Sequence, residues 1–321
     1  MALNFVVIAL GLLALVWSAD QFVEGAAAIA RSVGMSPLLI GMTIVSVGTS
    51  APEILVSLMA ALTGAGELAV GNALGSNIAN IGLVLGITLL ISPIVVGRTT
   101  AFIDLPILLG VIVLCGISLA DAVLSLVDAS LLTGALALYL IRIGSHLRRP
   151  DPNDTPPTVP EMPMMRAAGI FSMGLVVLIT SSRALVWAAV NIAEGFGVSE
   201  LVIGLTIVAF GTSLPELAAS TVSAIRGHAD IAIGAVVGSN MFNLLIVLAL
   251  PGFFETLHLS IADIQRDLGT VLATTVALTL FIWLGWQRDV GHARLGRRAG
   301  CLFLAMFVFY YIWLFYYVPQ V

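Results

Sequence analysis

The chain has 321 residues, of which 60% are hydrophobic and 10% charged, and its formal net charge at pH 7 is −5. A soluble domain carries about 25% charged residues, so this chain has too few polar side chains to coat a globule in water. Together with a mean hydropathy of +1.10, the composition excludes a soluble protein and predicts a polytopic membrane protein that is surrounded by the lipid bilayer.

Ten apolar segments follow one another along the chain, each near or above the roughly 20 residues that a helix needs to cross a bilayer. The segment 144–165 is polar and proline-rich, which is typical of an extended linker. We therefore expect an all-α fold of ten transmembrane helices: five at 1–143, a linker at 144–165 and five at 166–321. The predicted spans are about 4–29, 37–61, 69–91, 101–119, 124–143, 166–193, 200–225, 230–252, 266–286 and 299–317.

The arginines indicate the orientation of the chain, because cytoplasmic loops of membrane proteins are enriched in basic residues. All thirteen basic residues are arginines, and a cytoplasmic linker at 144–165 places eleven of them at cytoplasmic helix ends. Both termini are then extracytoplasmic, and the short loops favour a prokaryotic plasma membrane protein. The eleven are Arg31, Arg98, Arg142, Arg148, Arg149, Arg166, Arg226, Arg288, Arg294, Arg297 and Arg298.

Two stretches of the sequence occur twice. Residues 41–53 (GMTIVSVGTSAPE) correspond to 204–216 (GLTIVAFGTSLPE), and residues 71–80 (GNALGSNIAN) correspond to 234–243 (GAVVGSNMFN). Both pairs have the same offset, since 216 − 53 = 163 and 243 − 80 = 163. Five helices is an odd number, so the second half enters the membrane from the opposite side. We expect two inverted repeats, an architecture typical of secondary transporters.

Each copy carries one glutamate within an apolar helix, at Glu53 and at Glu216. An ionised carboxylate in hydrocarbon is costly, and carboxylates at such depth mark functional sites. A glutamate that pairs with an arginine or stays protonated is the alternative, but the same glutamate recurs in the same context and no arginine recurs beside it. The repetition therefore favours a site that both carboxylates share.

A proline precedes each glutamate, at Pro52 and at Pro215. Proline has no N–H, and its ring clashes with the carbonyl four residues back, so the helix is expected to open at Gly-Thr-Ser-x-Pro. Backbone carbonyls at 46–49 and 209–212, including those of Ser46 and Ala209, can then turn toward a cation. Irregular backbone at this depth is tolerated where it lines a cavity or is covered by protein, and a plain helix kink is the alternative.

The polar side chains around the breaks share helix faces, because residues at i and i+4 are neighbours on a helix. Ca²⁺ takes about six to eight hard oxygen ligands of this kind, and Na⁺ accepts the same donors. No Cys or His cluster offers softer ligands, so a transition-metal site is not expected. Close helix packing through Gly, Ser and Asn is the alternative. The candidate pairs are Thr49 with Glu53, Thr212 with Glu216, Ser76 with Asn80, and Ser239 with Asn243, together with Ser50 and Ser213.

The paired Gly-Thr-Ser-x-Pro-Glu and Gly-Ser-Asn-x-x-Asn blocks resemble the two alpha repeats of the sodium/calcium exchangers, in the cation/calcium exchanger superfamily. The resemblance covers nearly the whole chain. It implies an antiporter that exchanges Ca²⁺ for Na⁺ by alternating access, rather than an enzyme. We expect these two ions as the transported substrates, no resident cofactor, no nucleic-acid partner and a functional monomer.

The resemblance also implies a role for each oxygen donor. Ca²⁺ would be bound by Glu53, Glu216, Thr49 and Thr212. The Na⁺ sites would involve Ser76, Ser239 and the carbonyls of Ser46 and Ala209, and Asn80 and Asn243 would complete the central position. Potassium-dependent members carry Asp where this chain has Asn243, so the sequence does not predict a K⁺ requirement.

Three other functions are alternatives to sodium/calcium exchange. A proton/Ca²⁺ antiporter on the same fold would use protons in place of Na⁺ on Glu53 and Glu216. A passive cation channel needs a continuous pore, and the inverted repeat argues against it. A membrane enzyme is the weakest alternative, because the chain carries no Gly-x-Ser-x-Gly, His-Glu-x-x-His or nucleotide-binding loop.

Overall fold

The computed structural model describes residues 2–147, 162–196 and 209–317. Within these ranges the chain is mainly helical, and eight helices are long and apolar enough to cross a membrane. A ninth span results if the two helices at Pro37–Thr49 and Ala51–Leu62, which meet at an angle of 46°, are one bent span. The predicted span 200–225 begins outside the described residues. Most of the predicted linker 144–165 also lies outside them.

The helices match the predicted spans within a few residues. In the first half they are α1 (Ala2–Val33), α2 (Pro37–Ile40), the π-helix η1 (Gly41–Val45), α3 (Ser46–Thr49), α4 (Ala51–Leu62), α5 (Gly66–Ala79), the π-helix η2 (Asn80–Leu85), α6 (Gly86–Ile91), the π-helix η3 (Thr100–Asp104), α7 (Leu105–Ser118) and α8 (Leu126–Leu147). In the second half they are α9 (Met164–Gly195), α11 (Ala209–Thr212), α12 (Leu214–Ile225), α13 (Ala229–Phe242), the π-helix η5 (Asn243–Val247), the 3-10 helix η6 (Leu250–Phe253), α14 (Ile261–Leu284) and α15 (Arg297–Tyr317).

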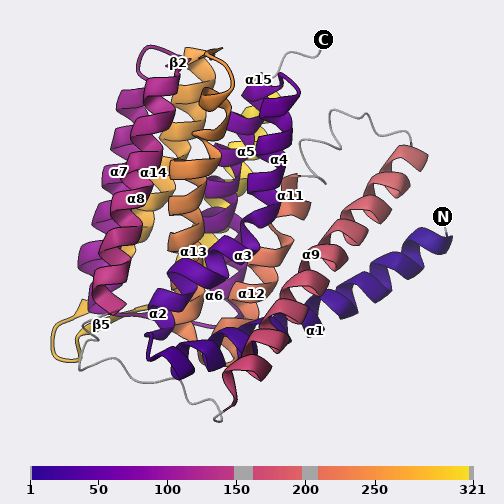
Figure 1. Ribbon diagram of the computed structural model, residues 1–321, viewed down its shortest axis with the longest axis vertical. Coiled ribbons are helices and arrows are strands. Elements are labelled where there is room, and N and C mark those ends of the chain that lie inside the picture. Colours follow the sequence, from indigo (N-terminus) through magenta and orange to yellow (C-terminus); the bar gives the residue numbers. More distant parts are fainter. Residues whose placement is uncertain (1, 148–161, 197–208, 318–321) are drawn as a thin grey trace.

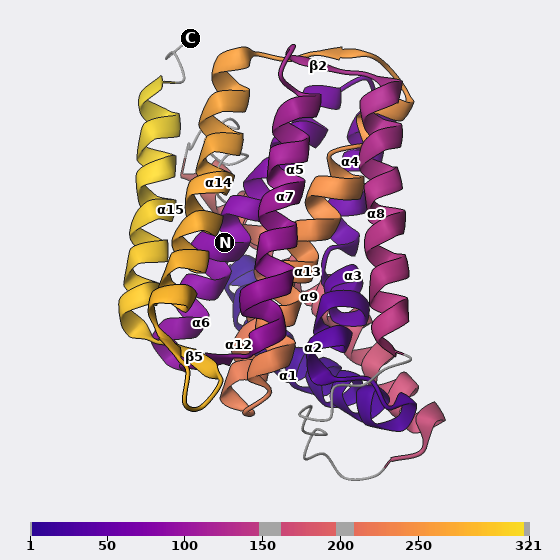
Figure 2. The same cartoon turned by 90° about the vertical axis from the view of Figure 1, so that its left-hand side faces the viewer.

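Five short strands depart from the all-α expectation. Strands β1 (Ile94–Val96), β5 (His292–Leu295) and β4 (Trp286–Gln287) form one antiparallel sheet, and β2 (Val123–Leu124) pairs with β3 (Leu257–His258). The two sheets lie at opposite ends of the bundle (Figure 2). Each joins a connection of the first half to one of the second half, for example with Ile94 opposite Leu295. The strands provide hydrogen-bond partners for the backbone N–H and C=O groups of these connections. They are too short to be predicted from a hydropathy pattern.

Helices α1 and α9 lie against each other and slant away from the rest of the bundle (Figure 1). Glycines permit this close approach: a Cβ at Gly25 would lie 2.5 Å from the backbone nitrogen of Phe171, and one at Gly174 would lie 2.6 Å from that of Phe22. The rings of Phe22 and Phe171 stack beside them, with centroids 4.8 Å apart. Small residues at a crossing are typical of membrane helices that pack tightly.

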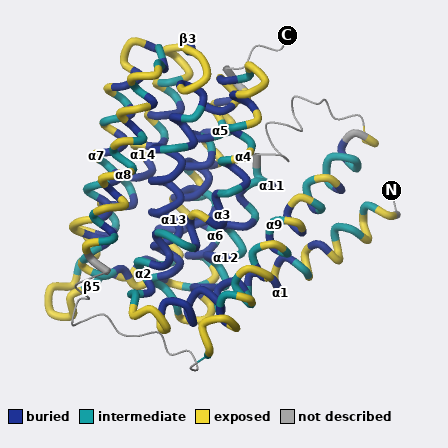
Figure 3. The backbone as a smooth tube through the Cα atoms, viewed as in Figure 1, coloured by how far each residue is buried: buried dark blue, intermediate teal, exposed yellow. Residues whose placement is uncertain are grey.

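The centre of the bundle consists of the spans that contain α5 and α13. Of the most apolar window in each, 78% is buried for Gly66–Ile91 and 94% for Ala229–Phe253, against 44% or less for the six other spans. Helices α7, α8, α14 and α15 stand side by side over them (Figure 2), and the buried backbone is concentrated inside (Figure 3). Polar residues of α5 and α13 therefore lie away from lipid.

The sequence repeat is matched by a repeat of local structure. The bounds of α4 and α12 differ by 214 − 51 and 225 − 62, and those of α5 and α13 differ by 229 − 66 and 242 − 79. All four differences equal the sequence offset of 163. The π-helices η2 and η5 begin at the equivalent residues Asn80 and Asn243. The two halves thus build the same broken and bulged helices in the same order.

A second pair of identical acidic residues, Asp104 and Asp267, has the same offset, since 267 − 104 = 163, and it was not singled out from the sequence. Asp104 and Asp267 are both buried, and each pairs with an arginine. The distance from Arg142 Nη1 to Asp104 Oδ1 is 3.3 Å, and that from Arg266 Nε to Asp267 Oδ1 is 2.6 Å. Because each carboxylate has a cationic partner, these pairs fit a structural role, in contrast to the two glutamates.

Arg226 joins the α1–α9 pair to the rest of the bundle. It caps α12, and its guanidinium forms ion pairs with Asp20 (2.5 Å) and Glu24 (3.3 Å) of α1. All three side chains are about one-third exposed, so solvent screens the interaction.

We expect Arg226→Gln to lower the free energy of unfolding by no more than about 1 kcal/mol. It should nevertheless accelerate amide hydrogen exchange in α1 near Asp20, because the ion pair tethers that turn. Hydrogen exchange measured by mass spectrometry checks this, with Arg98→Gln, which changes an exposed arginine before η3, as the matched control. Equal exchange rates in the two variants would contradict the tethering role.

Candidate cation site at the two helix breaks

Both glutamates lie buried in the first turn of a helix. Glu53 is 1% exposed at the start of α4, and Glu216 is 5% exposed at the start of α12. The N-terminal end of a helix carries partial positive charge on its free N–H groups. Each carboxylate therefore has a favourable position on its own helix although it is removed from water.

The helix breaks occur at Ser50 and Ser213. Their ψ values are both 2°, with φ of −82° and −87°. In a regular α-helix ψ is about −42°. The prolines two residues later cause the break, because each removes the N–H that would bond the carbonyl of Gly48 or Gly211. The freed carbonyl of Gly211 accepts a hydrogen bond from Ser182 Oγ of α9 at 2.8 Å.

The carbonyl of Ser46 is less free than the sequence suggested. It accepts a hydrogen bond from the Ser50 backbone N–H at 2.9 Å and one from Thr49 Oγ1 at 3.4 Å. The reason is that Pro52 removes the donor to Gly48, two residues further along, and leaves the bond to Ser46 in place. Ala209 begins α11, and only its backbone is described.

The break in the first half contacts the carboxylate of the second half. Ser50 Oγ donates to Glu216 Oε1 at 3.4 Å, although the residues are 166 positions apart. The hydroxyl of Thr49 also reaches Glu216, and the Glu53 carboxylate is close enough to interact with it electrostatically. Two carboxylates from different halves thus share one buried region, and their like charges repel each other there.

Several buried oxygens of the candidate residues and of Ser220, one turn after Glu216, lack a hydrogen-bond partner within the described part of the chain. Leaving a buried acceptor without a donor costs about 1–3 kcal/mol. A coordinated cation is one kind of partner that such acceptors can take, because its ligands are oxygen lone pairs. Among these oxygens are Glu53 Oε2, Glu216 Oε2, Ser220 Oγ, Ser239 Oγ and Asn243 Oδ1.

The remaining candidates lie on the two central spans and are buried as well. Ser76 and Asn80 come from the α5–η2 span and Ser239 and Asn243 from the α13–η5 span, with exposed fractions of 6%, 2%, 0% and 1%. Asn80 Nδ2 donates to Asn240 Oδ1 at 3.1 Å, which joins the two central spans. Thr49 and Ser213 are likewise buried, and Thr212 ends α11 directly before the second break.

Two buried serines beside the glutamates, Ser57 and Ser220, were not singled out from the sequence, whereas Asn72 was expected on the polar face of the α5 span. Ser57 and Ser220 recur at the same offset, since 220 − 57 = 163, and each lies one turn after a glutamate and is buried. Asn72 Nδ2 donates to the Glu53 carbonyl at 3.1 Å and to Ser57 Oγ at 3.0 Å, so it holds α4 on α5. The repeated Glu-x-x-x-Ser spacing was the signal that could have revealed the two serines.

The sequence model of the family described as "Sodium/calcium exchanger protein" matches residues 3–143 and 166–316. The chain belongs to this family. It is therefore related to membrane transporters that exchange cations, and not to enzymes. Within the family, the chain resembles the putative antiporter CaxA of Alkalimonas amylolytica, with 44% identity over 95% of this chain and 96% of the relative.

Further relatives extend the likeness to bacteria and archaea. The inner membrane protein YrbG of Escherichia coli (strain K12) is 37% identical over 98% of this chain and 96% of its own. The sodium/calcium exchanger MaX1 of Methanosarcina acetivorans is 30% identical over 98% and 99%. A solved structure of the sodium-calcium exchanger NCX_Mj superimposes with a TM-score of 0.82 at 31% identity, covering 98% of this chain and 99% of that one.

Proposed function

We propose that this family member is a secondary antiporter that exchanges Ca²⁺ for Na⁺ across the membrane by alternating access. The observation that carries the proposal is the meeting of Glu53 and Glu216, one from each half, in a buried layer where oxygens lack partners. Two carboxylates match the charge of one Ca²⁺, and hydroxyl, amide and carbonyl oxygens suit both ions. The relative MaX1, named a sodium/calcium exchanger, supports the choice of ions.

The proposed architecture is ten transmembrane helices in two inverted repeats, 1–143 and 166–321, joined by a cytoplasmic linker at 144–165. The identical helix offsets support two equivalent halves, and the family match falls into two segments that begin again at residue 166. Five spans in each half would invert the second half and place both termini outside. The bacterial and archaeal relatives favour a prokaryotic plasma membrane, and we propose that one copy suffices for transport.

The proposed ligands come from the two helix breaks and from the two central spans. Ca²⁺ would be held by Glu53, Glu216, Thr49 and Thr212, with Asn80 and Asn243 completing the central position. The Na⁺ positions would use Ser50, Ser213, Ser76, Ser239 and the carbonyls of Ser46 and Ala209. The Ser46 carbonyl already accepts bonds from the Ser50 N–H at 2.9 Å and from Thr49 Oγ1 at 3.4 Å, so a cation at this oxygen would take the place of the longer Thr49 bond.

The two carboxylates explain why such a carrier would exchange ions and not leak them. Enclosing Glu53 and Glu216 without a cation would bury two uncompensated charges, which is strongly unfavourable. One Ca²⁺ or several Na⁺ remove that penalty, so the carrier changes sides when it is loaded. Because both ions need the same carboxylate oxygens, each displaces the other.

A proton/Ca²⁺ antiporter on the same fold is the second candidate. The same two buried carboxylates could take up protons on one side and release them on the other, and the CaxA relative is named only as a putative antiporter. The site geometry is compatible with either coupling ion, so the distinction is experimental.

Ca²⁺ uptake into proteoliposomes tests the coupling ion. We expect uptake of radioactive Ca²⁺ to be at least tenfold faster into vesicles that are preloaded with Na⁺ than into vesicles with choline at the same pH. A reversed Na⁺ gradient should drive Ca²⁺ out. Uptake that follows a pH gradient and ignores Na⁺ would replace the proposal by the proton-coupled one.

A further inference from the structure

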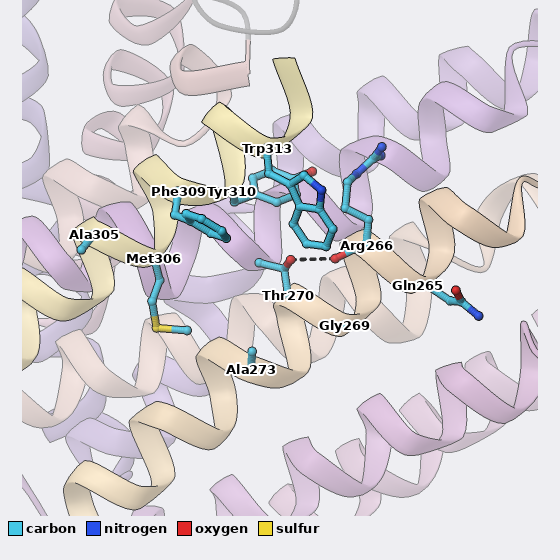
Figure 4. Close-up of a pocket in the computed structure, with 10 residues that line it drawn as sticks. All are labelled: Gln265, Arg266, Gly269, Thr270, Ala273, Ala305, Met306, Phe309, Tyr310 and Trp313. Carbon is cyan, nitrogen blue, oxygen red and sulfur yellow. Dashed lines mark hydrogen bonds between the residues drawn. The ribbon is translucent and has the colours of Figure 1, made fainter. Parts of the chain in front are cut away.

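Two apolar grooves flank the first half of α14. One lies between α14 and α15, with a volume of about 580 Å³ (Figure 4), and the other lies between α14 and α7, with about 610 Å³. Both are lined by Gln265 and Gly269, so the grooves meet across the same turn of the helix. Figure 4 shows the side chains of Phe309 and Trp313 from α15 facing α14 across the first groove.

The grooves open toward the lipid side of the bundle. Large apolar side chains at their edges are exposed, among them Ile117 (69%), Ile261 (58%) and Phe309 (65%). In a membrane protein such a surface contacts acyl chains. Gly269 keeps the ridge between the grooves low, and a Cβ at this position would have no described atom within 4 Å.

A cluster of charges lies on the same stretch of α14, beside the first groove. Arg266 lines the first groove, and its guanidinium bonds Asp263 at 2.7 Å and Asp267 at 2.6 Å and 3.0 Å. These bonds use three of its five N–H groups, so two can serve an outside acceptor. Asp263 is 56% exposed, whereas Asp267 is covered and also accepts from Tyr310 at 3.1 Å.

We propose that one diacyl phospholipid with a primary-ammonium headgroup sits astride α14. Each groove holds one acyl chain, the phosphate accepts from the free N–H groups of Arg266, and the ammonium binds the exposed carboxylate of Asp263. One headgroup with two chains fits two grooves that converge on Gln265 and Gly269. The two carboxylates and one guanidinium sum to −1, which favours a headgroup with an ammonium over a purely anionic one.

Native mass spectrometry of the full chain in detergent tests the proposal. After addition of dioleoyl phosphatidylethanolamine, we expect one lipid to stay bound through delipidation. Gly269→Leu places an apolar side chain on the ridge, where it obstructs both grooves. The fraction of protein with bound lipid should fall at least tenfold. Asp263→Asn should reduce it severalfold, and dioleoyl phosphatidylcholine, whose methylated ammonium cannot donate hydrogen bonds, should bind severalfold more weakly.

Gly134→Leu on α8 is the matched control, because Gly134 is exposed and a Cβ there also meets open space among the described residues. It should retain the lipid, and thermal unfolding of both glycine variants checks that they are folded. Equal retention by Gly269→Leu and the control overturns the site. Equal binding of the two lipids overturns the headgroup assignment, and a dimer that Gly269→Leu dissociates would show that a second copy fills the grooves.

Discussion

Glu53→Gln and Glu216→Gln are each expected to lower Na⁺-driven Ca²⁺ uptake at least 100-fold, to the level of empty vesicles. Each change removes one of the two charges that would compensate Ca²⁺ at the proposed site, while the side chain keeps its shape. A 100-fold loss corresponds to about 2.8 kcal/mol, near the lower end of the roughly 2–5 kcal/mol that is lost when one partner of a buried charge pair is truncated. Uptake rates in proteoliposomes of equal protein content measure the effect.

Glu67→Gln is the control, because Glu67 is exposed in the first turn of α5 and outside the buried layer. It should transport at the wild-type rate. Thermal unfolding should show both site variants folded, since an amide in place of a carboxylate reduces the burial penalty. Normal transport by either site variant would refute the assignment of the cation site, whichever ion drives the exchange.

Gly238→Ala should lower the free energy of unfolding by about 2–3 kcal/mol, the cost of overpacking a tight core position. A Cβ at this position would lie 2.6 Å from Ser46 Oγ and 2.7 Å from the Cα and carbonyl oxygen of Met42. The Met42 contacts are with backbone atoms where α13 crosses η1 and α3, so they cannot yield by rotating a side chain. A gain of about 1 kcal/mol in helix propensity offsets only part of the cost.

The midpoint of thermal unfolding in detergent measures this change. Gly134→Ala on α8 is the control, because the added methyl group meets open space in the described structure and should leave stability unchanged or slightly raised. Because the clash reaches Ser46, the Gly238 variant should also transport more slowly when it is folded. Equal unfolding midpoints for the Gly238→Ala and Gly134→Ala variants would contradict the close contact of α13 with η1.

The glycine contacts explain why the site depends on the crossing of the two halves. A Cβ at Gly41 would lie 2.6 Å from the Ile231 carbonyl oxygen, and one at Gly234 would lie 2.6 Å from that of Leu38. Together with Gly238, these glycines let the first broken helix lie directly on α13. That approach brings the break at Ser50 within reach of Glu216.

Much of this protein follows from local properties of its sequence. The hydrocarbon thickness requires long apolar runs, so the spans that are fully described match the predicted ranges within a few residues. Proline removes a helix bond wherever it occurs, so the breaks lie at Ser50 and Ser213 as predicted. The constant offset between the two halves also carries into the helix bounds, because equal sequences form equal local structures.

The tertiary structure alone decided which groups meet. No spacing rule predicts that Ser50 donates to Glu216, that Asn80 bonds Asn240, or that the Asp104 carboxylate is paired by Arg142 of another helix. These contacts depend on how closely and at what angle the helices cross, which is set by small residues distant in sequence. The sequence therefore determined the membrane spans and the chemistry of the oxygen donors, and the packing of the two halves determined which of these groups contact each other.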